Sequence, residues 1–396
     1  MGKADNPARP SGQSSADLLI VGGGIMGLWA AVHAERQGID TILVDAGLLG
    51  QGASGGVLGA LMPYMPDRWD NKKQFQLEAL VSLETDIAEL EGETGLSASY
   101  RRSGRLIPLP KPHLRKIALG HSRDADSHWR HGESQFHWNV VDEPVGGSGW
   151  IDPAAGESGF VHDTLAARVA PRGLIGVLSA FLRRARHVRI IEGVEITQID
   201  PDRGIALTDD GSIRFGRCIL SAGHRSFPLL DSLTDGLQKP LGQPVKGQAA
   251  LLRADVDPGL PVLFRDGLYI VPHEGGLVAV GSTSENRFGD ALSTDEQLDG
   301  LLSAARAMVP VLSGAEVVER WAGLRPKAID RDPMIGTHPD HPSLIALTGG
   351  FKITFGLAHR LAEVALGEVS GTSLAAAKMP DGFTLASHIG VASRKT

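Results

Sequence analysis

Two short apolar runs enclose a helical pattern near the start of the chain. Residues 17–21 have the length and the nearly continuous apolar character of a buried parallel strand. Apolar residues then recur at helical spacing over residues 25–32, and Gly38 stands where a left-handed helix cap would fall. A second apolar strand, residues 41–44, ends at Asp45. The pattern predicts a β–α–β unit with a parallel sheet.

Later parts of the chain show other periodicities. Residues 294–309 form an amphipathic helical pattern opened by Ser293 or Thr294, with Glu296 in its first turn. Alternating apolar and polar positions predict strands of an antiparallel sheet over residues 248–253, 267–272 and 277–280.

Composition narrows the class of protein. With 396 residues the chain is long enough for two or three domains. Cys218 is the one cysteine, so no internal disulfide can form, and a reducing cytoplasm is the expected location. The formal net charge of -7 excludes a global positive field, so we do not expect nucleic acid as a main partner.

The terminus and the hydropathy argue against a membrane protein. Residues 1–16 are polar and rich in Gly, Pro and Ser, so they predict a loose tail without the apolar core of a secretory signal. No run approaches the roughly 18 apolar residues needed to span a bilayer. We therefore expect no membrane span.

The first turn carries the strongest chemical signal. The sequence Gly22-Gly-Gly24-Ile-Met-Gly27 is a GxGxxG motif between the first strand and the first helix. Gly22 permits the tight turn, Gly24 lets the backbone approach a pyrophosphate, and Gly27 lets helix and strand pack closely. The helix N-terminus favours phosphate, and Asp45 stands where a carboxylate accepts hydrogen bonds from a ribose diol. The motif predicts a dinucleotide site but does not distinguish FAD from NAD.

A stretch of small residues over 47–56 follows Asp45 and leads into residues 57–62. Its Gly52-Ala-Ser-Gly55 segment resembles the D-amino-acid oxidase superfamily of FAD-dependent oxidoreductases, which includes glycine oxidase and sarcosine oxidase. The resemblance continues in order to about residue 368. Residues 168–184 resemble a family helix that follows a proline-containing turn. The GVEITQID segment around Val194 is similar to a family strand that contacts adenine through its backbone, so Val194 is expected in a strand. The other segments that carry the resemblance are Arg217–Gly223, Pro244–Gln248, Leu268–Pro272 with Gly281, Trp321–Pro326, Asp330–Gly336 and Gly349–Leu357.

The resemblance implies FAD as cofactor. Branches that attach flavin covalently use a cysteine near the C-terminal signature or a histidine near the early Ser-Gly loop, and neither occurs here, so we expect non-covalent FAD. Cys218 is expected to be a buried small hydrophobe. The implied cofactor-binding residues are Gly22, Gly24, Ile25, Met26, Gly27, Asp45, Ala46, Ala53, Ser54, Val57, Leu58, Gly59, Val194, Ala222, Gly223, Gly350, Phe351, Lys352, Ile353 and Thr354.

Three residues are implied in catalysis. Arg325 matches the family arginine that fixes a substrate carboxylate, with a structural ion pair as its alternative. Tyr269 would cap the site above the flavin, or be a half-buried strand residue. Lys352 lies in a GGFKIT segment that departs from the family's Gly-His-Phe/Tyr-Arg-Asn-Gly pattern. It would stabilise the reduced flavin, hold a second carboxylate or extend to solvent.

Two other clusters have simpler explanations. Histidines 121, 128, 131 and 137 match no standard zinc spacing, so we expect no metal site. The basic run 183–187 falls at a helix C-terminus, where cations interact favourably with the helix dipole.

The fold class expected is α/β. A Rossmann-like FAD-binding domain with a mostly parallel sheet is predicted over residues 17–95, 150–240 and 320–370. An interleaved, smaller α+β substrate domain with an antiparallel sheet is predicted over residues 96–149 and 241–319, followed by a C-terminal extension, 371–396.

The leading hypothesis is an FAD-dependent oxidoreductase that oxidises the C–N bond of a small amine or amino acid, with dioxygen or another electron acceptor as partner. One alternative is a dehydrogenase, or a subunit of one, that passes electrons to a non-oxygen acceptor. Others are a nicotinamide-dependent dehydrogenase and a non-catalytic flavoprotein. The sequence leaves a homo-oligomer open.

Overall fold

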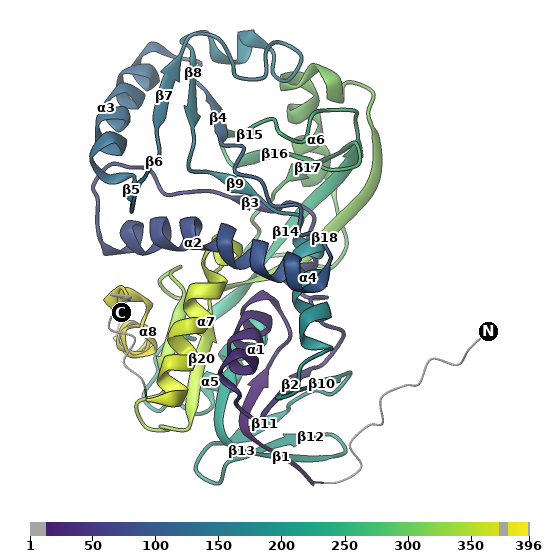
Figure 1. Ribbon diagram of the computed structural model, residues 1–396, viewed down its shortest axis with the longest axis vertical. Helices are drawn as coiled ribbons and strands as arrows, with labels where there is room; N and C mark the ends of the chain where they lie inside the picture. The colour runs from purple at the N-terminus through teal and green to yellow at the C-terminus, as the bar shows by residue number, and fades with distance from the viewer. Residues whose placement is uncertain (1–12, 372–378, 395–396) are drawn as a thin grey trace, which may run out of the picture.

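The computed structural model describes residues 13–371 and 379–394. Its strands form two eight-stranded sheets, one in the lower and one in the upper half of Figure 1. The first strand, β1 (Gln13–Val21), begins earlier than the sequence pattern predicts. Residues 13–16 therefore belong to the sheet and not to a loose tail, and the rest of the predicted tail lies outside the described residues.

The lower sheet has a parallel centre. Strands β10 (Val188–Glu192), β2 (Thr41–Asp45), β1, β13 (Gly211–Leu220) and β20 (Leu344–Thr348) run parallel to their neighbours. Antiparallel strands β12 (Ile205–Thr208), β11 (Gln198–Asp200) and β19 (Met334–Thr337) extend it. The predicted Rossmann-like sheet is confirmed.

Both faces of this sheet are covered, which explains the continuous apolar run of β1. Leu18 and Ile20 belong to one core with helices α1 (Ile25–Gln37), α2 (Asn71–Thr94), α4 (Pro171–Leu182) and α7 (Thr354–Ser370). Leu19 and Val21 belong to a second core with α5 (Ser226–Asp231) and α8 (Leu385–Ala392). A strand with two buried faces cannot alternate in polarity.

The upper sheet is largely antiparallel. Its order is β18 (Glu316–Ala328), β14 (Gly242–Arg253), β17 (Leu277–Gly281), β16 (Leu268–His273), β15 (Val262–Arg265), β4 (Arg105–Pro108), β8 (Phe160–Asp163) and β7 (Trp138–Val141). Only the β15–β4 pair is parallel among these neighbours of the described chain. Two of the strands predicted from alternation, 248–253 and 277–280, lie within β14 and β17. The third, 267–272, overlaps β16, which begins one residue later and ends one residue later.

Helices α3 (Pro112–His128) and α6 (Glu296–Met308) belong to the upper half of the molecule. Neither predicted cap of α6, Ser293 or Thr294, is the observed one: the Asp295 carboxylate accepts the hydrogen bond from the Gln297 amide at 3.1 Å. Two short strand pairs lie outside the large sheets: β3 (Ala60–Leu61) pairs with β9 (Ala167–Arg168), and β5 (Arg130–His131) pairs with β6 (Ser134–Gln135).

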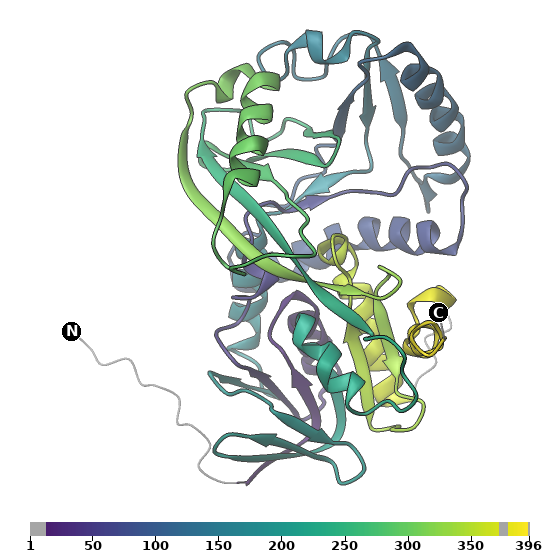
Figure 2. The ribbon, with the colours of Figure 1, turned by 180° about the vertical axis from the view of Figure 1, so that it is seen from behind.

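Strands β14 and β18 connect the two halves of the molecule. They pair along almost their whole length and run diagonally from the lower half into the upper one (Figure 2). Side chains near their middle therefore lie where the two sheets approach each other. The residue boundaries predicted for the domains stay a prediction.

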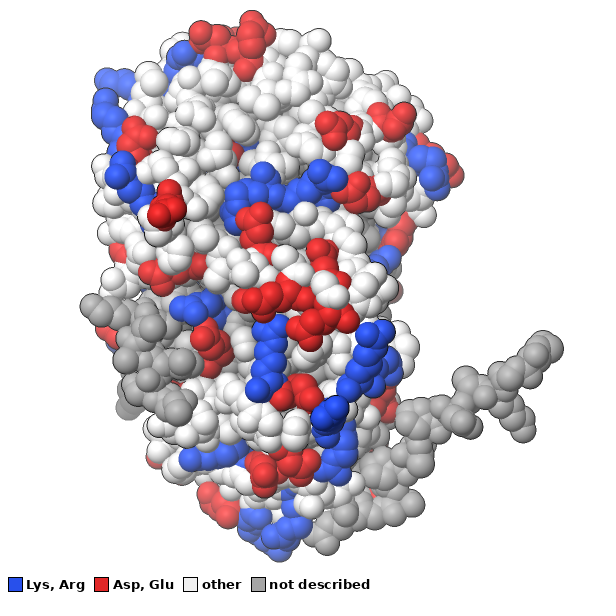
Figure 3. All heavy atoms as spheres, viewed as in Figure 1, with Lys and Arg blue, Asp and Glu red and all other residues white. Residues whose placement is uncertain are grey.

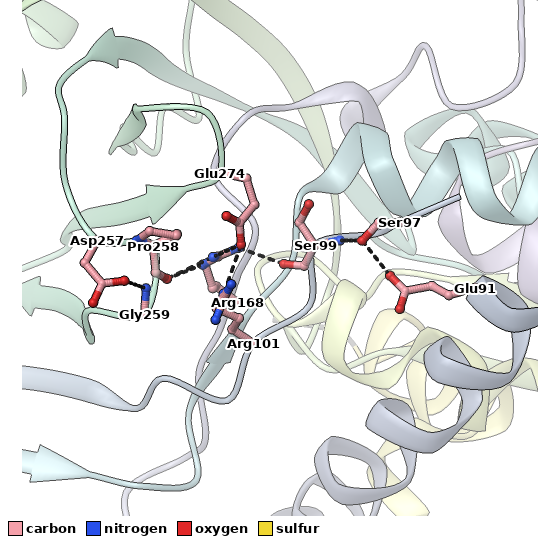
Figure 4. A network of polar contacts seen from close by, with 9 residues as sticks. All are labelled: Glu91, Ser97, Ser99, Arg101, Arg168, Asp257, Pro258, Gly259 and Glu274. Atoms are coloured by element: carbon pink, nitrogen blue, oxygen red, sulfur yellow. Dashed lines mark hydrogen bonds and ion pairs between the residues drawn. The ribbon is translucent and has the colours of Figure 1, made fainter. Parts of the chain in front are cut away.

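A buried arginine ties four chain segments together (Figure 4). The Arg168 guanidinium is fully buried and donates hydrogen bonds to the carbonyl oxygens of Ser99 and Pro258, at 2.7 and 2.9 Å. It also contacts the Glu274 carboxylate at 3.1 Å, which Arg101 reaches from the surface at 2.9 Å. Since a buried cation without partners is costly, this network fixes the loops around β9 and β16.

The surface carries interspersed charge, as the face in Figure 3 shows. Arg36, for example, pairs with Glu89 and Glu93 across α1 and α2. Within the described ranges, every helix is too short or too polar to cross a bilayer. Two of the clustered histidines contact aromatic rings: His128 stacks on Trp69 and His121 meets Trp138 edge-on.

Candidate functional site

One large cavity, with a volume of about 1260 Å³, lies between the two sheets. It exceeds the roughly 300–1,000 Å³ of ordinary small-molecule sites. Elements of both halves line it, from the β1–α1 turn at one end to β16 and β18 at the other. Every predicted site residue lines this cavity except Gly27 and Gly350. The structure thus brings together residues that are more than 300 positions apart in the sequence.

The glycine turn has the close packing that its motif predicts. Gly22 has φ +106°, and a Cβ on it would lie 2.3 Å from the carbonyl oxygen of Ser221. A Cβ on Gly27 would lie 1.9 Å from the carbonyl oxygen of Gly22. Gly27 therefore packs the helix against the strand and does not face the cavity.

The N-terminus of α1 faces the cavity through Gly24, Ile25 and Met26. Ser54, in the short helix Ala53–Gly55, accepts a hydrogen bond from the Ile25 amide at 3.0 Å. The first amides of a helix lack partners within the helix and carry a partial positive charge. This end of the cavity therefore suits a phosphate group.

Asp45 lies at the end of β2, beside this helix terminus. Its two carboxylate oxygens accept hydrogen bonds from the amides of Gly23, at 2.6 Å, and Gly47, at 2.8 Å. Each oxygen keeps acceptor capacity for a sugar hydroxyl. The amide of Val194 donates to the Asp45 carbonyl at 3.0 Å, so these two residues line the cavity together.

One detail of this region differs from expectation. Val194 was predicted in a strand, but β10 ends at Glu192 and β11 begins at Gln198, so Val194 lies in the loop between them. Its amide hydrogen bond runs to the last residue of β2 and not along a strand ladder. The loop still reaches the cavity beside Asp45. The glycine turn, the α1 N-terminus, Asp45 and the loop at Val194 together fit the ADP half of a dinucleotide.

Arg325 lies on β18 at the other end of the cavity. Its Nη1 donates a hydrogen bond to the carbonyl oxygen of Thr283 at 3.1 Å. Burial lowers the pKa of Arg325 to about 10, although the nearby Tyr269 and Glu285 act in the opposite direction. Within the described residues Arg325 forms no ion pair, so the structural ion-pair alternative has no support here. A partly desolvated guanidinium that lines a cavity can bind a carboxylate through two hydrogen bonds.

Tyr269 lies on β16 and lines the same end of the cavity. Its ring lies 4.8 Å from that of Phe264, centre to centre. Burial raises the pKa of the Tyr269 phenol, and the positive charges of Arg105 and Arg325 oppose this shift. The phenol is therefore neutral at physiological pH, and it lies close enough to Arg325 for an electrostatic interaction.

Lys352 lies in a turn that is attached to β18 next to Arg325. The Phe351 amide donates to the Pro326 carbonyl at 3.1 Å, and Gly350 pairs with Lys327. Phe351 has φ +47°, an uncommon backbone conformation for a non-glycine residue. The side chain of Lys352 is exposed and lines the cavity. Partial desolvation by the surrounding chain and the positive charge of Arg325 lower the pKa of its ammonium.

A buried polar cluster behind Arg325 was not predicted. Thr283 Oγ1 donates to Glu285, and Gln248 Nε2 donates to Glu285 at 2.9 Å and to Asp295 at 2.8 Å. Lys246 Nζ lies 3.8 Å from Glu285 and 3.6 Å from Asp295, with its residue only 2% exposed. The cluster holds the segment whose Thr283 carbonyl receives Arg325. The sequence signal that could have indicated this cluster is the presence of Lys246 and Gln248 within the otherwise apolar strand β14.

Trp321 was also missed as a site residue. Its ring lines the cavity and lies where a Cβ on Gly56 or Gly323 would contact it, at 3.3 and 2.5 Å. Cys218, by contrast, is fully buried in β13 as expected, away from the cavity lining, and burial raises the pKa of its thiol.

Comparisons with known proteins agree with this geometry. The sequence model of the family described as "FAD dependent oxidoreductase" matches residues 17–364. A glycine oxidase of Pseudomonas putida is 30% identical over 350 residues, covering 85% of this chain and 90% of its own. A glycine oxidase of Bacillus licheniformis is 26% identical over 348 residues, covering 85% and 88%. The crystal structure of glycine oxidase from Geobacillus kaustophilus superimposes with a TM-score of 0.81 at 22% identity, covering 94% of this chain and 98% of that one.

Proposed function

Since this chain belongs to the family of FAD-dependent oxidoreductases, we propose that it oxidises the C–N bond of a small amino acid or amine. The observation that carries the proposal is the Arg325 guanidinium, which has no ion-pair partner among the described residues and lines the same cavity as the Gly22–Gly24 turn. The glycine oxidase relatives, similar over most of their length, support an amino acid as substrate. A nicotinamide cofactor has no such support.

The proposed site divides the cavity between cofactor and substrate. The turn at Gly22 and Gly24, the α1 N-terminus and Asp45 would hold the ADP half of FAD, without a covalent bond. The ring would lie between the Ser54 loop and the segment 350–354. Bound FAD supplies the hydride acceptor, its N5 atom, for the hydrogen on the substrate carbon.

The chain's own residues would bind and orient the substrate. Arg325 would hold the carboxylate through two parallel hydrogen bonds, since its hydrogen bond to the Thr283 carbonyl orients the guanidinium and leaves other N–H donors for a ligand. The Tyr269 phenol would donate a third hydrogen bond and cover the site. The α-carbon would then face the ring, and the imine product would be hydrolysed by water to a carbonyl compound and ammonia or an amine.

Anaerobic titration tests the proposal. Glycine, N-methylglycine and a panel of D- and L-amino acids are added under nitrogen while the flavin absorbance near 450 nm is followed. We expect at least one of them to bleach the flavin and to yield one carbonyl product per flavin reduced. If none does, the proposed function is wrong. Reoxidation of the bleached enzyme by air or by a dye then separates an oxidase from a dehydrogenase.

A further inference from the structure

The cavity end that carries Arg325 holds a second cation, the ammonium of Lys352. The two belong to backbone segments that are joined directly, since Phe351 donates to the carbonyl of Pro326 at 3.1 Å and Gly350 pairs with Lys327. Their charges interact, because Arg325 lowers the pKa of Lys352. Two like charges therefore lie close together at one end of one cavity.

Neither cation has a carboxylate partner within the described part of the chain. Arg325 donates to the neutral Thr283 carbonyl, and Lys352 Nζ lies 5.6 Å from the centre of the Phe351 ring. Structural arginines of this protein look different: Arg168 and Arg172, for example, contact Glu274 and Glu319 at 3.1 and 2.5 Å. Within the described residues, Lys352 and Arg325 thus differ from these arginines in having N–H donors that contact no carboxylate.

The acidic residues near the cavity are engaged elsewhere. Asp45 accepts hydrogen bonds from two amides at the far end, and Glu195 forms an ion pair with Arg225 at 2.7 Å. Glu285 lies close to Arg325 but does not line the cavity, and it is held by Gln248 at 2.9 Å and faces Lys246 at 3.8 Å. Among the residues that the structure describes, no acidic group at this end of the cavity therefore compensates the charge of Lys352.

One carboxylate neutralises only one of the two cations. Its oxygens keep lone pairs for further hydrogen bonds after a bidentate contact with Arg325, but it carries a single negative charge. The exposed ammonium of Lys352 would then remain uncompensated in charge, and a second carboxylate within its reach would gain an ion pair.

We propose, building on the function proposed above, that the preferred substrate carries two anionic groups. Arg325 binds the carboxylate next to the reacting carbon, and Lys352 binds the second carboxylate. The substrate class is an acidic amino acid or an amine that carries two carboxylates. Lys352 is the residue that selects this class over a simple monocarboxylic amino acid.

Binding of unreactive acids to the holoenzyme tests this inference without turnover. Dissociation constants for acetate and succinate are measured from the change in the flavin spectrum, at pH 7.5 and constant ionic strength. Wild type is compared with Lys352→Met, which keeps an unbranched side chain one atom shorter and without charge, and with Lys352→Arg, which keeps the charge. The ratio of the two constants within each variant cancels any general effect of Lys352 on the flavin.

We expect succinate to bind about tenfold or more tighter than acetate in wild type and in Lys352→Arg. In Lys352→Met the ratio of the acetate to the succinate dissociation constant should fall to about two, the statistical factor that arises because either carboxylate of succinate can bind Arg325. A wild-type ratio at that statistical value, or a ratio that Lys352→Met leaves unchanged, would overturn the inference. If acetate binds and Arg325→Met abolishes its binding, the proposed carboxylate anchor stands even when this inference fails. If Arg325→Met leaves the dissociation constant of acetate unchanged, both the proposed carboxylate anchor and this inference are overturned.

Discussion

The guanidinium of Arg325 lies directly against the backbone of Gly247. A methyl group placed on Gly247 would meet Nη1 of Arg325 at 2.0 Å and its Cζ at 2.1 Å. The two residues belong to paired strands, β18 and β14, in which Gly247 faces Gly323. The missing side chain of Gly247 therefore decides where the guanidinium can lie, and with it the position of a bound carboxylate.

Gly247→Ala should displace Arg325 and weaken substrate binding. The far end of the arginine can move, so the fold should survive while the carboxylate site is distorted. We expect KM for the best amino acid to rise about tenfold or more, with the flavin spectrum retained. Gly120→Ala is the matched control, because the added methyl group would meet no described residue within 4 Å apart from the adjoining turns of its own helix. Equal KM values for the two variants would contradict the assigned contact.

Arg325→Met should remove most carboxylate affinity. Loss of a bidentate charge-assisted contact predicts a rise in KM of about 100-fold or more, while FAD stays bound at the far end of the cavity. Arg325→Lys should recover only part of the loss, since an ammonium cannot form two parallel hydrogen bonds. Steady-state kinetics with one amino acid measure both variants. An unaltered KM in Arg325→Met would remove Arg325 from the substrate site.

Glu285→Gln should act on KM more than on kcat. Glu285 accepts hydrogen bonds from Thr283 and Gln248 and faces Lys246, so it holds the segment that receives Arg325 without lining the cavity. Its amide counterpart keeps the volume but leaves Lys246 with one carboxylate fewer. We expect KM to rise about five- to tenfold, with kcat changed less than twofold. Glu316→Gln, at an exposed ion pair with Arg253, should change neither. Equal effects on kcat and KM in Glu285→Gln would argue for a general loss of structure.

Asp86→Asn should stabilise the protein at neutral pH. Burial raises the pKa of Asp86 from 3.8 to about 6, so the folded protein binds more protons than the unfolded chain between these pH values. Stability therefore falls as the pH rises through this window and the charged carboxylate becomes costly. The nearby His359, whose pKa burial lowers well below 6.5, stays neutral and does not compensate.

Urea denaturation of the holoenzyme measures the effect. We expect a gain of about 1–2 kcal/mol at pH 8 and a smaller gain at pH 5. Glu89→Gln, on the exposed face of the same helix, should stay within about 0.5 kcal/mol at both pH values. A loss of stability at pH 8 in Asp86→Asn would show that the charged form is favoured in the fold.

The sequence predicts the nucleotide end better than the substrate end. Strand, glycine turn, helix and Asp45 follow one another within 33 residues, so local patterns suffice to place them. The predicted start of the first strand is less accurate. Residues 13–16 join β1 because they pair with β13, a long-range contact that no local pattern encodes. Val194 was misplaced for a similar reason, because its hydrogen bond to Asp45 ends the strand register.

The substrate end depends on contacts between distant segments. Resemblance to a known family brought Arg325, Tyr269 and Lys352 into view, but not the buried cluster of Lys246, Thr283 and Glu285 behind them. Those residues look like ordinary strand and loop positions until β14 and the segment after β17 are paired. The same holds for Gly247, whose meaning appears only when β18 places Arg325 against it.

A crystal structure of the holoenzyme with a bound unreactive carboxylate would locate both the flavin ring and the substrate anchor. We expect the flavin ring between the Ser54 loop and residues 350–354, with the carboxylate in a bidentate contact with Arg325, each N–O distance near 2.8 Å. A ring bound elsewhere, or a carboxylate in the cavity that leaves Arg325 without contact, would contradict this expectation.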